Sequence, residues 1–124
     1  MTPAALSSLL VVDDAAEIRT LFRTAFGLDH PNVDLAVADS AEEALRVVSG
    51  WRPDAVVVDA VMPGMDGIEL IRRLRPVLPE AHIVMFSSVS HGRLASEAVA
   101  AGANDFIEKS EGLDALLRAL GLAS

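Results

Sequence analysis

The sequence predicts an α/β fold in which helices cover both faces of a parallel sheet. Four short runs rich in apolar residues are typical of strands buried on both faces, namely Leu9–Val12, Ala55–Val58, Ile83–Phe86 and the weaker Asp105–Glu108. Segments with helical spacing separate them, and a strand followed by a helix recurs at intervals of roughly two dozen residues. Apolar residues make up 52% of the chain but aromatic residues only 4%, so the core is aliphatic. We therefore expect one doubly wound α/β domain over residues 1–124.

The first half of the chain predicts three strands and two helices. After the strand at 9–12, a first helix is indicated by apolar residues at helical spacing: Ile18, Leu21, Phe22, Ala25 and Phe26. Val33–Val37 alternates in polarity, which favours an edge strand with one wetter face. The run from Ser40 to Glu43 has the composition of a capping box, so a second helix is expected to follow it and to end near Gly50 before the strand at 55–58.

The second half continues the alternation with three further helices. Asp66 is expected to cap the third helix, with Glu69 in its first turn. The fourth helix is expected over Leu94–Ala101 and ends at Gly102. The last helix follows from four leucines at helical spacing: Leu113, Leu116, Leu117 and Leu120. Prolines are expected only between elements or at their ends, at positions 53, 63, 76 and 79.

Charge and composition exclude several classes of function. Acidic residues outnumber basic ones by 18 to 10, so the net charge is −8, and direct binding of nucleic acid by this segment is not expected. The absence of cysteine excludes disulfides, cysteine metal sites and thiol chemistry. No signal peptide and no apolar run long enough to cross a membrane is found, so a cytoplasmic protein without membrane contact is expected.

Polar residues end four of the five predicted strands in a way that suggests a single site. In a flavodoxin-like (βα)5 fold the five parallel strands have the order 2-1-3-4-5, and ligands bind beyond their carboxyl ends. Strands 1, 3, 4 and 5 are then neighbours, and the residues that follow them converge on one edge of the sheet. These residues are Asp13, Asp14, Asp59, Ser87 and Lys109.

The chemistry of these side chains indicates phosphoryl transfer. Three carboxylates brought together repel one another and favour a cation, and oxygen ligands alone favour Mg²⁺. Lys109 supplies a compact positive charge for a phosphoryl oxygen, and Ser87 supplies a hydroxyl donor. Such groups around a carboxylate suit the transfer of a phosphoryl group onto it. Asp59 is the expected acceptor because it stands alone at the end of the central strand, whereas Asp13 and Asp14 form a pair.

At these residues the sequence resembles the receiver domains of bacterial two-component response regulators, the CheY-like superfamily. The matching motifs are Leu10–Asp14, Val58–Gly67, Phe86–Ser88 and Gly102–Lys109, which together span most of the chain in the expected order. The resemblance implies a phosphoacceptor at Asp59. It implies that Mg²⁺ is held by Asp14, Asp59 and the backbone carbonyl of Val61, with Asp13 acting mainly through water. It further implies that Ser87 and Lys109 contact the phosphoryl group and that Phe106 is the aromatic switch residue.

The resemblance also implies a role. The domain is expected to take its phosphoryl group from a histidine kinase or a histidine phosphotransfer protein. It would then change the surface formed by the fourth helix, fifth strand and fifth helix, and so control a downstream effector or a fused output domain, of which none is expected within these residues. It would be a regulator rather than an enzyme with a separate substrate, present as a monomer or as a phosphorylation-dependent dimer.

Three departures from the family pattern carry expectations of their own. Lys109 is followed by Ser110 rather than by proline, which removes the usual reason for a cis peptide bond there. Val61 and Val89 lie two residues beyond Asp59 and Ser87, and both are apolar. A hydrolytic water would find no polar side-chain partner there, which predicts a long-lived phosphoryl state. Phe106 lacks the hydroxyl of tyrosine, so its switching must depend on packing.

Other interpretations exist for single residues and for the function of the domain as a whole. Asp14 with Glu17 could be no more than a helix cap, Asp59 and Ser87 could be no more than turn or loop residues, and Lys109 could be a solvated lysine. A pseudo-receiver that binds partners without phosphorylation remains possible. A Mg²⁺-dependent phosphatase with an aspartate nucleophile is disfavoured, because Ala15 occupies the position where its general acid would stand. An FMN or nucleotide site is disfavoured by the acidic loop after the first strand.

Overall fold

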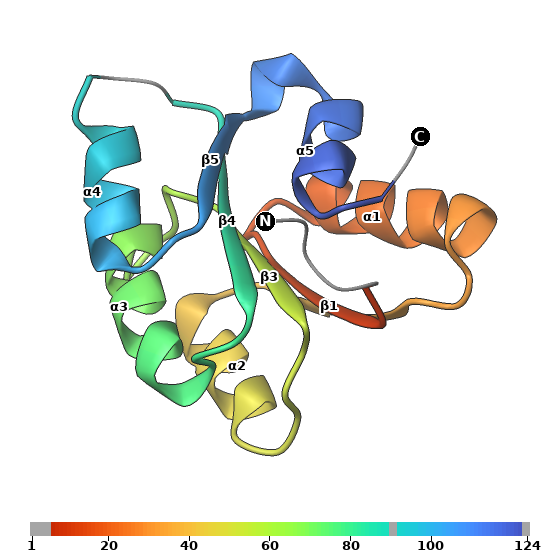
Figure 1. Cartoon of the computed structure of the whole chain (residues 1–124), viewed down its shortest axis with the longest axis horizontal. Coiled ribbons are helices and arrows are strands. Elements are labelled where there is room, and N and C mark those ends of the chain that lie inside the picture. Colours follow the sequence, from red (N-terminus) through yellow and green to blue (C-terminus); the bar gives the residue numbers. More distant parts are fainter. Residues whose placement is uncertain (1–5, 90–91, 123–124) are drawn as a thin grey trace.

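The computed structural model describes residues 6–89 and 92–122 and shows a five-stranded sheet in the order β2-β1-β3-β4-β5, all of whose pairs are parallel (Figure 1). The strands are β1 (Ser8–Val12), β2 (Asp34–Ala38), β3 (Ala55–Val58), β4 (His82–Ser87) and β5 (Asp105–Glu108). The helices are α1 (Ala16–Asp29), α2 (Ala41–Val48), α3 (Gly67–Val77), α4 (Leu94–Ala101) and α5 (Leu113–Ala119), with a 3₁₀ turn, η1 (Lys109–Glu111), before α5. The predicted fold class and strand order are confirmed.

The sheet separates two cores, because successive side chains of a strand point to opposite faces. In β1, Leu10 and Val12 pack toward α2, α3 and α4, whereas Leu9 and Val11 pack toward α1 and α5. Figure 1 shows this division, with α2, α3 and α4 on one side of the twisted sheet and α1 and α5 on the other. The residues of β1 and β3 from Leu9 to Val12 and from Ala55 to Val58 are at most 2% exposed, as expected for central parallel strands.

The start of the edge strand was predicted one residue too early. The edge strand begins at Asp34 and not at Val33, because the amide of Val33 donates to the carbonyl of His30 in a turn that precedes the ladder. Pro76, which was expected between elements or at the end of one, lies at the end of α3, one position before its last residue. It occupies the last turn, where the loss of one amide donor and the crowding by the proline ring affect only the end of the helix.

The predicted helix starts are confirmed in their main contact. The Ser40 hydroxyl accepts from the amide of Glu43 at 3.1 Å, and Asp66 accepts from the amide of Glu69 at 2.9 Å. In a standard capping box the Glu43 carboxylate would accept from the amide of the cap residue, Ser40. Here it accepts instead from the amide of Asp39, one residue earlier, at 2.9 Å. The start of α2 is thereby fixed at the same sheet edge as the candidate site.

Arg75 joins four segments at the opposite edge of the sheet. This half-buried guanidinium makes six hydrogen bonds of 2.8–3.2 Å, which link the end of α3, the start of β4, the end of α4 and the start of β5. Its acceptors are the carbonyl oxygens of Leu78, Pro79, Ala81 and Gly102 and the Oδ1 of Asn104. The network satisfies carbonyls at two helix ends that would otherwise lack partners.

Replacing Arg75 by methionine is therefore expected to lower the free energy of unfolding by about 2 kcal/mol, because several part-buried carbonyls lose a charged donor. Arg72→Met on the same helix is the matched control, since Arg72 is exposed and has one contact of 3.4 Å with Glu69. The control is expected to change stability by less than about 0.5 kcal/mol. Urea unfolding of both variants measures the difference, and equal effects would contradict the structural role of Arg75.

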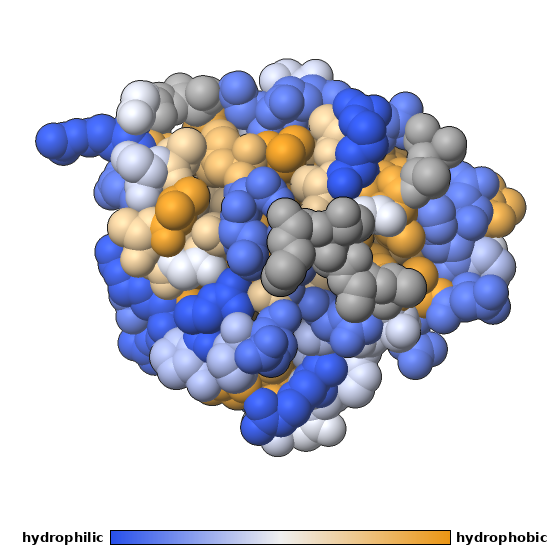
Figure 2. Space-filling view, viewed as in Figure 1, coloured by the Kyte–Doolittle hydropathy of each residue, from blue (hydrophilic) through white to orange (hydrophobic). Residues whose placement is uncertain are grey.

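Figure 2 shows one face of the molecule, on which hydrophilic residues and apolar areas lie side by side. Within the part of the chain that the structure describes, no helix combines the length and the apolar character needed to span a bilayer.

Candidate functional site

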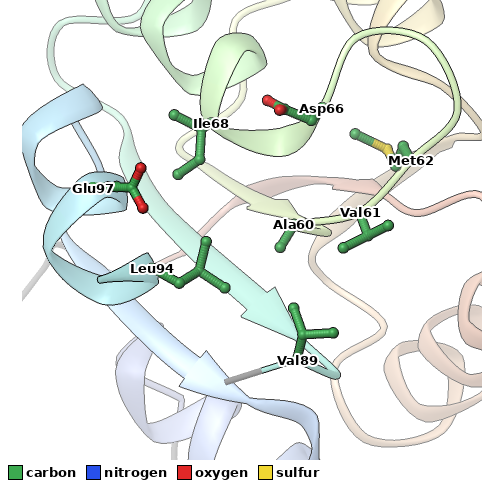
Figure 3. Close-up of a pocket in the computed structure, with 8 residues that line it drawn as sticks. All are labelled: Ala60, Val61, Met62, Asp66, Ile68, Val89, Leu94 and Glu97. Carbon is green, nitrogen blue, oxygen red and sulfur yellow. The ribbon is translucent and has the colours of Figure 1, made fainter. Parts of the chain in front are cut away.

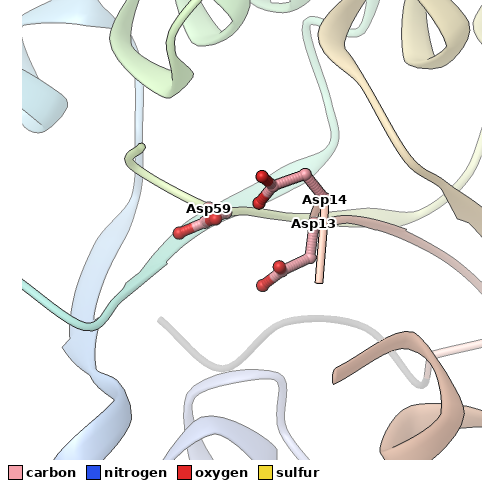
Figure 4. A group of neighbouring side chains, drawn as sticks. All are labelled: Asp13, Asp14 and Asp59. Carbon is pink, nitrogen blue, oxygen red and sulfur yellow. The ribbon is translucent and has the colours of Figure 1, made fainter. Parts of the chain in front are cut away.

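Three aspartates gather at the carboxyl edge of the sheet. Asp13 and Asp14 follow β1, Asp59 follows β3, and one carboxylate oxygen from each lies within 4.8 Å of the others (Figure 4). The parallel ladder continues one residue past the strands, since the amide of Asp59 donates to the carbonyl of Val12 at 3.0 Å. The backbone of the cluster is thus held by the sheet itself. The predicted convergence of these three residues is present in the structure.

Lys109 is the counter-charge of this cluster. Its Nζ lies 2.8 Å from Asp13 Oδ2 and 3.5 Å from Asp59 Oδ1, and its side chain is only 19% exposed. The interpretation of Lys109 as a solvated surface lysine is therefore wrong. Its Nζ also lies 6.0 Å from the centre of the Phe86 ring, so the amine sits between the carboxylates and an apolar wall.

The electrostatics of the cluster centre on Asp59. Burial and the nearby charge of Asp13 raise the pKa of Asp59 from its ordinary value of 3.8 to about 6, although Lys109 and the backbone amide of Val61 favour the charged form. Burial disfavours the charged amine of Lys109, but the hydrogen bond and charge of Asp13, together with Asp59, raise its pKa overall. The cluster therefore carries more negative charge than one lysine compensates, which is the condition under which a site favours a further cation.

Asp13 is the most constrained of the three aspartates. Oδ1 accepts from the amide of Ala15 at 2.9 Å, Oδ2 binds Lys109, and the carbonyl accepts from Arg19 Nη1 at 2.9 Å. Asp14 is exposed, and Ala15, not Asp14, is the N-cap residue of α1, with no side-chain capping bond. The interpretation of Asp14 as a helix cap is wrong, and its carboxylate stands free of that role beside Asp59.

Ser87 lies at the end of β4, as its place in the strand-end pattern predicts, and Phe106, which the family resemblance singled out, lies within β5. Ser87 is the last residue of β4 and fully buried, and its hydroxyl donates to the carbonyl of Val89 at 2.9 Å while accepting from the Val89 amide at 3.1 Å. Ser87 thus also serves as the first residue of a turn, as the simpler interpretation suggested. Phe106 is half-buried on β5 against the core under α2, α3 and α4, and Val61 is 59% exposed.

The segment after β5 differs from the proline-containing form of the family pattern. No cis peptide bond occurs among residues 6–89 and 92–122, so the bond between Lys109 and Ser110 is trans. The chain continues into the 3₁₀ turn, whose start is held by a reciprocal capping box between Glu108 and Glu111. This capping box holds the backbone of Glu108, the residue before Lys109, in a segment that has no proline.

Gly67 is a site residue that sequence reasoning missed. It begins α3, and a Cβ atom there would overlap with the carbonyl oxygen of Asp59 and lie 3.0 Å from the Cα of Ala60. Its amide donates to the carbonyl of Ala60 at 3.1 Å. Only glycine permits the start of α3 to pack this closely on the backbone that carries Asp59. A glycine directly after a helix cap, where side chains are usually tolerated, was the available signal.

We expect Gly67→Ala to lower the free energy of unfolding by about 2 kcal/mol, because the overlapping atoms belong to the backbone and cannot rotate away. Gly27→Ala is the control, since Gly27 lies in α1 with nothing within 4 Å of its Cβ position. The control is expected to stabilise the protein by about 0.5–1 kcal/mol through helix propensity. Urea denaturation distinguishes the two, and a neutral Gly67→Ala would refute the close approach.

The sequence of this chain is similar to a known protein family and to several known proteins. The family model described as "Response regulator receiver domain" matches residues 9–121. The chain is 34% identical over 119 residues to the "Chemotaxis protein CheY" of Listeria monocytogenes, covering 94% of this chain and 97% of that protein. It is 37% identical over 112 residues to "Response regulator MprA" of Mycolicibacterium vanbaalenii, covering 88% of this chain but only 46% of that protein.

Solved structures agree with the sequence comparisons. The response regulator TrrA of Thermotoga maritima, solved in complex with Mg²⁺-BeF, superposes with a TM-score of 0.82 at 28% identity, covering 94% of this chain and 97% of that one. The BeF3-activated N-terminal receiver domain of RstA from Klebsiella pneumoniae gives a TM-score of 0.82 at 29% identity, covering 92% and 95% of the two chains.

Proposed function

The chain belongs to the response regulator receiver domain family, and from this premise we propose that it is a phosphorylation-dependent switch with Asp59 as the phosphoacceptor. The observation that carries the proposal is the placement of Asp59 at the end of the central strand β3, 6% exposed, within the aspartate cluster and 3.5 Å from Lys109. A carboxylate in that place is held still, poorly solvated and next to a cation that can bind a phosphoryl oxygen.

Each residue of the site has a role in this proposal. One Asp59 oxygen attacks the phosphorus of a phosphohistidine, the P–N bond breaks, and the imidazole takes up a proton as it leaves. Lys109 and Ser87 then bind oxygens of the transferred group, and Asp13 holds Lys109 in place through its contact of 2.8 Å. Phe106 is the switch residue, which would move by packing alone because it has no hydroxyl.

The aspartate cluster fits a Mg²⁺ ion. Three carboxylates with oxygen atoms within 4.8 Å, and a negative charge that Lys109 does not fully offset, match the ligands that this ion prefers. We propose Asp14, Asp59 and the carbonyl of Val61 as ligands, with Asp13 acting mainly through water. When bound, the ion would neutralise charge on the phosphoryl oxygens.

The partners are proposed from the same premise. A histidine kinase or histidine phosphotransfer protein would supply the phosphoryl group in the cytoplasm. The surface of α4, β5 and α5 would then control an effector or an output domain. The chain is proposed to act as a regulator, not as an enzyme on a separate substrate.

Intact mass spectrometry after incubation with Mg²⁺ and phosphoramidate tests the proposal. We expect one phosphoryl adduct, absent from Asp59→Asn and absent when EDTA is added. Because the side chains of Val61 and Val89 are apolar and cannot bind a hydrolytic water, the lifetime of the adduct is expected to be longer than seconds.

The controls separate the competing functions. Asp39→Asn, at an exposed aspartate beyond β2, is the matched variant and should be phosphorylated like the wild type. Steady release of phosphate without an adduct would point to the phosphatase instead. No adduct with any donor would leave the pseudo-receiver as the better account.

A further inference from the structure

A pocket of about 350 Å³ opens beside the loop that carries Asp59, between the start of α3 and α4. Figure 3 shows side chains from four segments around a common space: the loop after β3, the start of α3, the loop after β4, and α4. Its apolar wall includes Ile68 of α3 and Leu94 of α4, with Val61 and Val89 at its sides. We call it the α3–α4 pocket.

The rim of the α3–α4 pocket is exposed and acidic. Val61 is 59% and Val89 41% exposed, which makes them two of the large apolar residues that the described surface leaves to solvent. The ionisable side chains in the lining are Asp66 and Glu97, both exposed, and the described lining holds no lysine or arginine. A concave apolar surface bordered by charge of one sign can complement a group that combines an apolar part with the opposite charge.

We propose that the α3–α4 pocket binds an aliphatic side chain of a partner protein that is flanked by a lysine or arginine. The volume is ample for one aliphatic side chain, since it lies at the lower end of the range that holds small-molecule ligands. The carboxylates of Asp66 and Glu97 complement a cation beside that group. A second copy of this chain is a poor occupant, because two molecules of net charge −8 repel each other.

The pocket is also linked to the proposed switch, and this link depends on the proposed function. The Ser87 hydroxyl donates its single proton to the carbonyl of Val89, at 2.9 Å, and Val89 forms one wall of the pocket. If Ser87 donates to a phosphoryl oxygen on Asp59, it must release the carbonyl of Val89, which leaves the Val89 amide as its remaining contact with that residue. Phosphorylation therefore changes the position of one pocket wall, and the partner side chain binds the two states with different affinity.

Binding is tested on the unmodified protein with isopentylguanidinium, an aliphatic chain that carries one cation, and with isopentylurea as its uncharged match. In ¹H–¹⁵N NMR titrations we expect saturable shifts at Ile68, Leu94 and Val61, with the guanidinium probe bound at least threefold more tightly. Glu97→Gln should weaken the guanidinium probe about two- to fivefold, as expected for a surface ion pair. Glu80→Gln, at an exposed glutamate beyond α3, should not change it.

Equal binding of the two probes, shifts spread over the acidic surface without saturation, or equal effects of Glu97→Gln and Glu80→Gln would each overturn the pocket. The titration is then repeated on the phosphoryl adduct, with donor-treated Asp59→Asn as the control. We expect the affinity to change at least threefold in the adduct only, and an unchanged affinity would overturn the link. Failure to form the adduct would refute the proposed function but not the pocket, because the first titration does not use it.

Discussion

Asp59→Asn is expected to stabilise the protein by about 3 kcal/mol at pH 8 in the absence of divalent cations, and by less than about 1 kcal/mol at pH 4. The pKa of Asp59 is about 6 in the folded protein against an ordinary value of 3.8, mainly because burial and the charge of Asp13 disfavour its charged form. The folded protein therefore retains a proton between about pH 4 and pH 6 that the unfolded chain has released. Stability falls as the pH rises through this window, and it stays low above it.

Asparagine has nearly the same shape as aspartate but no charge to desolvate. The stability of the variant therefore does not fall with the titration of position 59. Urea unfolding of wild type and variant with EDTA at both pH values measures it, and the difference between the proteins removes the contribution of other titrating groups. Mg²⁺ is expected to reverse the order at pH 8, because it stabilises the wild-type carboxylate and binds the folded cluster. A variant that is no more stable than wild type at pH 8 would show that Asp59 is not the destabilised carboxylate.

Lys109→Met is expected to lower the free energy of unfolding by at least 3 kcal/mol at pH 8 without divalent cations. Methionine retains most of the side-chain volume but removes the one charge that faces both Asp13, 2% exposed, and Asp59, 6% exposed. Breaking a buried ion pair by removing one partner costs about 3–5 kcal/mol, and the 19% exposure of the lysine side chain places this case at the lower end.

The loss should be smaller at pH 5, because Asp59 then takes up a proton in place of the missing cation. A double-mutant cycle with Asp59→Asn isolates the coupling, since Lys109 should contribute less once position 59 is neutral. Arg118→Met in α5 is the matched control at an exposed cation, where little change is expected. Strict additivity of Lys109→Met and Asp59→Asn would contradict the proposed charge balance.

Sequence patterns predicted the parts of this molecule that depend on local composition. The runs at Ala55–Val58 and Asp105–Glu108 are strands with the expected bounds, since buried parallel strands leave little choice of residue. The boundary of β2 was one residue off, because the turn bond from Val33 to His30 depends on backbone geometry that alternation of polarity does not encode.

The site could be predicted as a set of residues but not as a set of contacts. Convergence of Asp13, Asp59 and Lys109 follows from strand order, because the ends of neighbouring parallel strands meet. Strand order does not predict that Asp13 rather than Asp59 is the closer partner of Lys109, since it fixes where the backbones end but not which way the lysine side chain turns. Arg75 was missed because its acceptors lie in four segments, and a basic residue in a last helical turn is common.

The sequence contains one lysine, Lys109, and its amine is held between Asp13 and Asp59. Reagents that acylate ε-amines therefore have a single side-chain target in this chain, and each acylation removes the cation on which the site depends. Acyl phosphates can transfer their acyl group as well as their phosphoryl group, so phosphoramidate is the cleaner donor. The rate of acylation at this one position, resolved by mass, also becomes a footprint of the site: whatever engages the amine protects it.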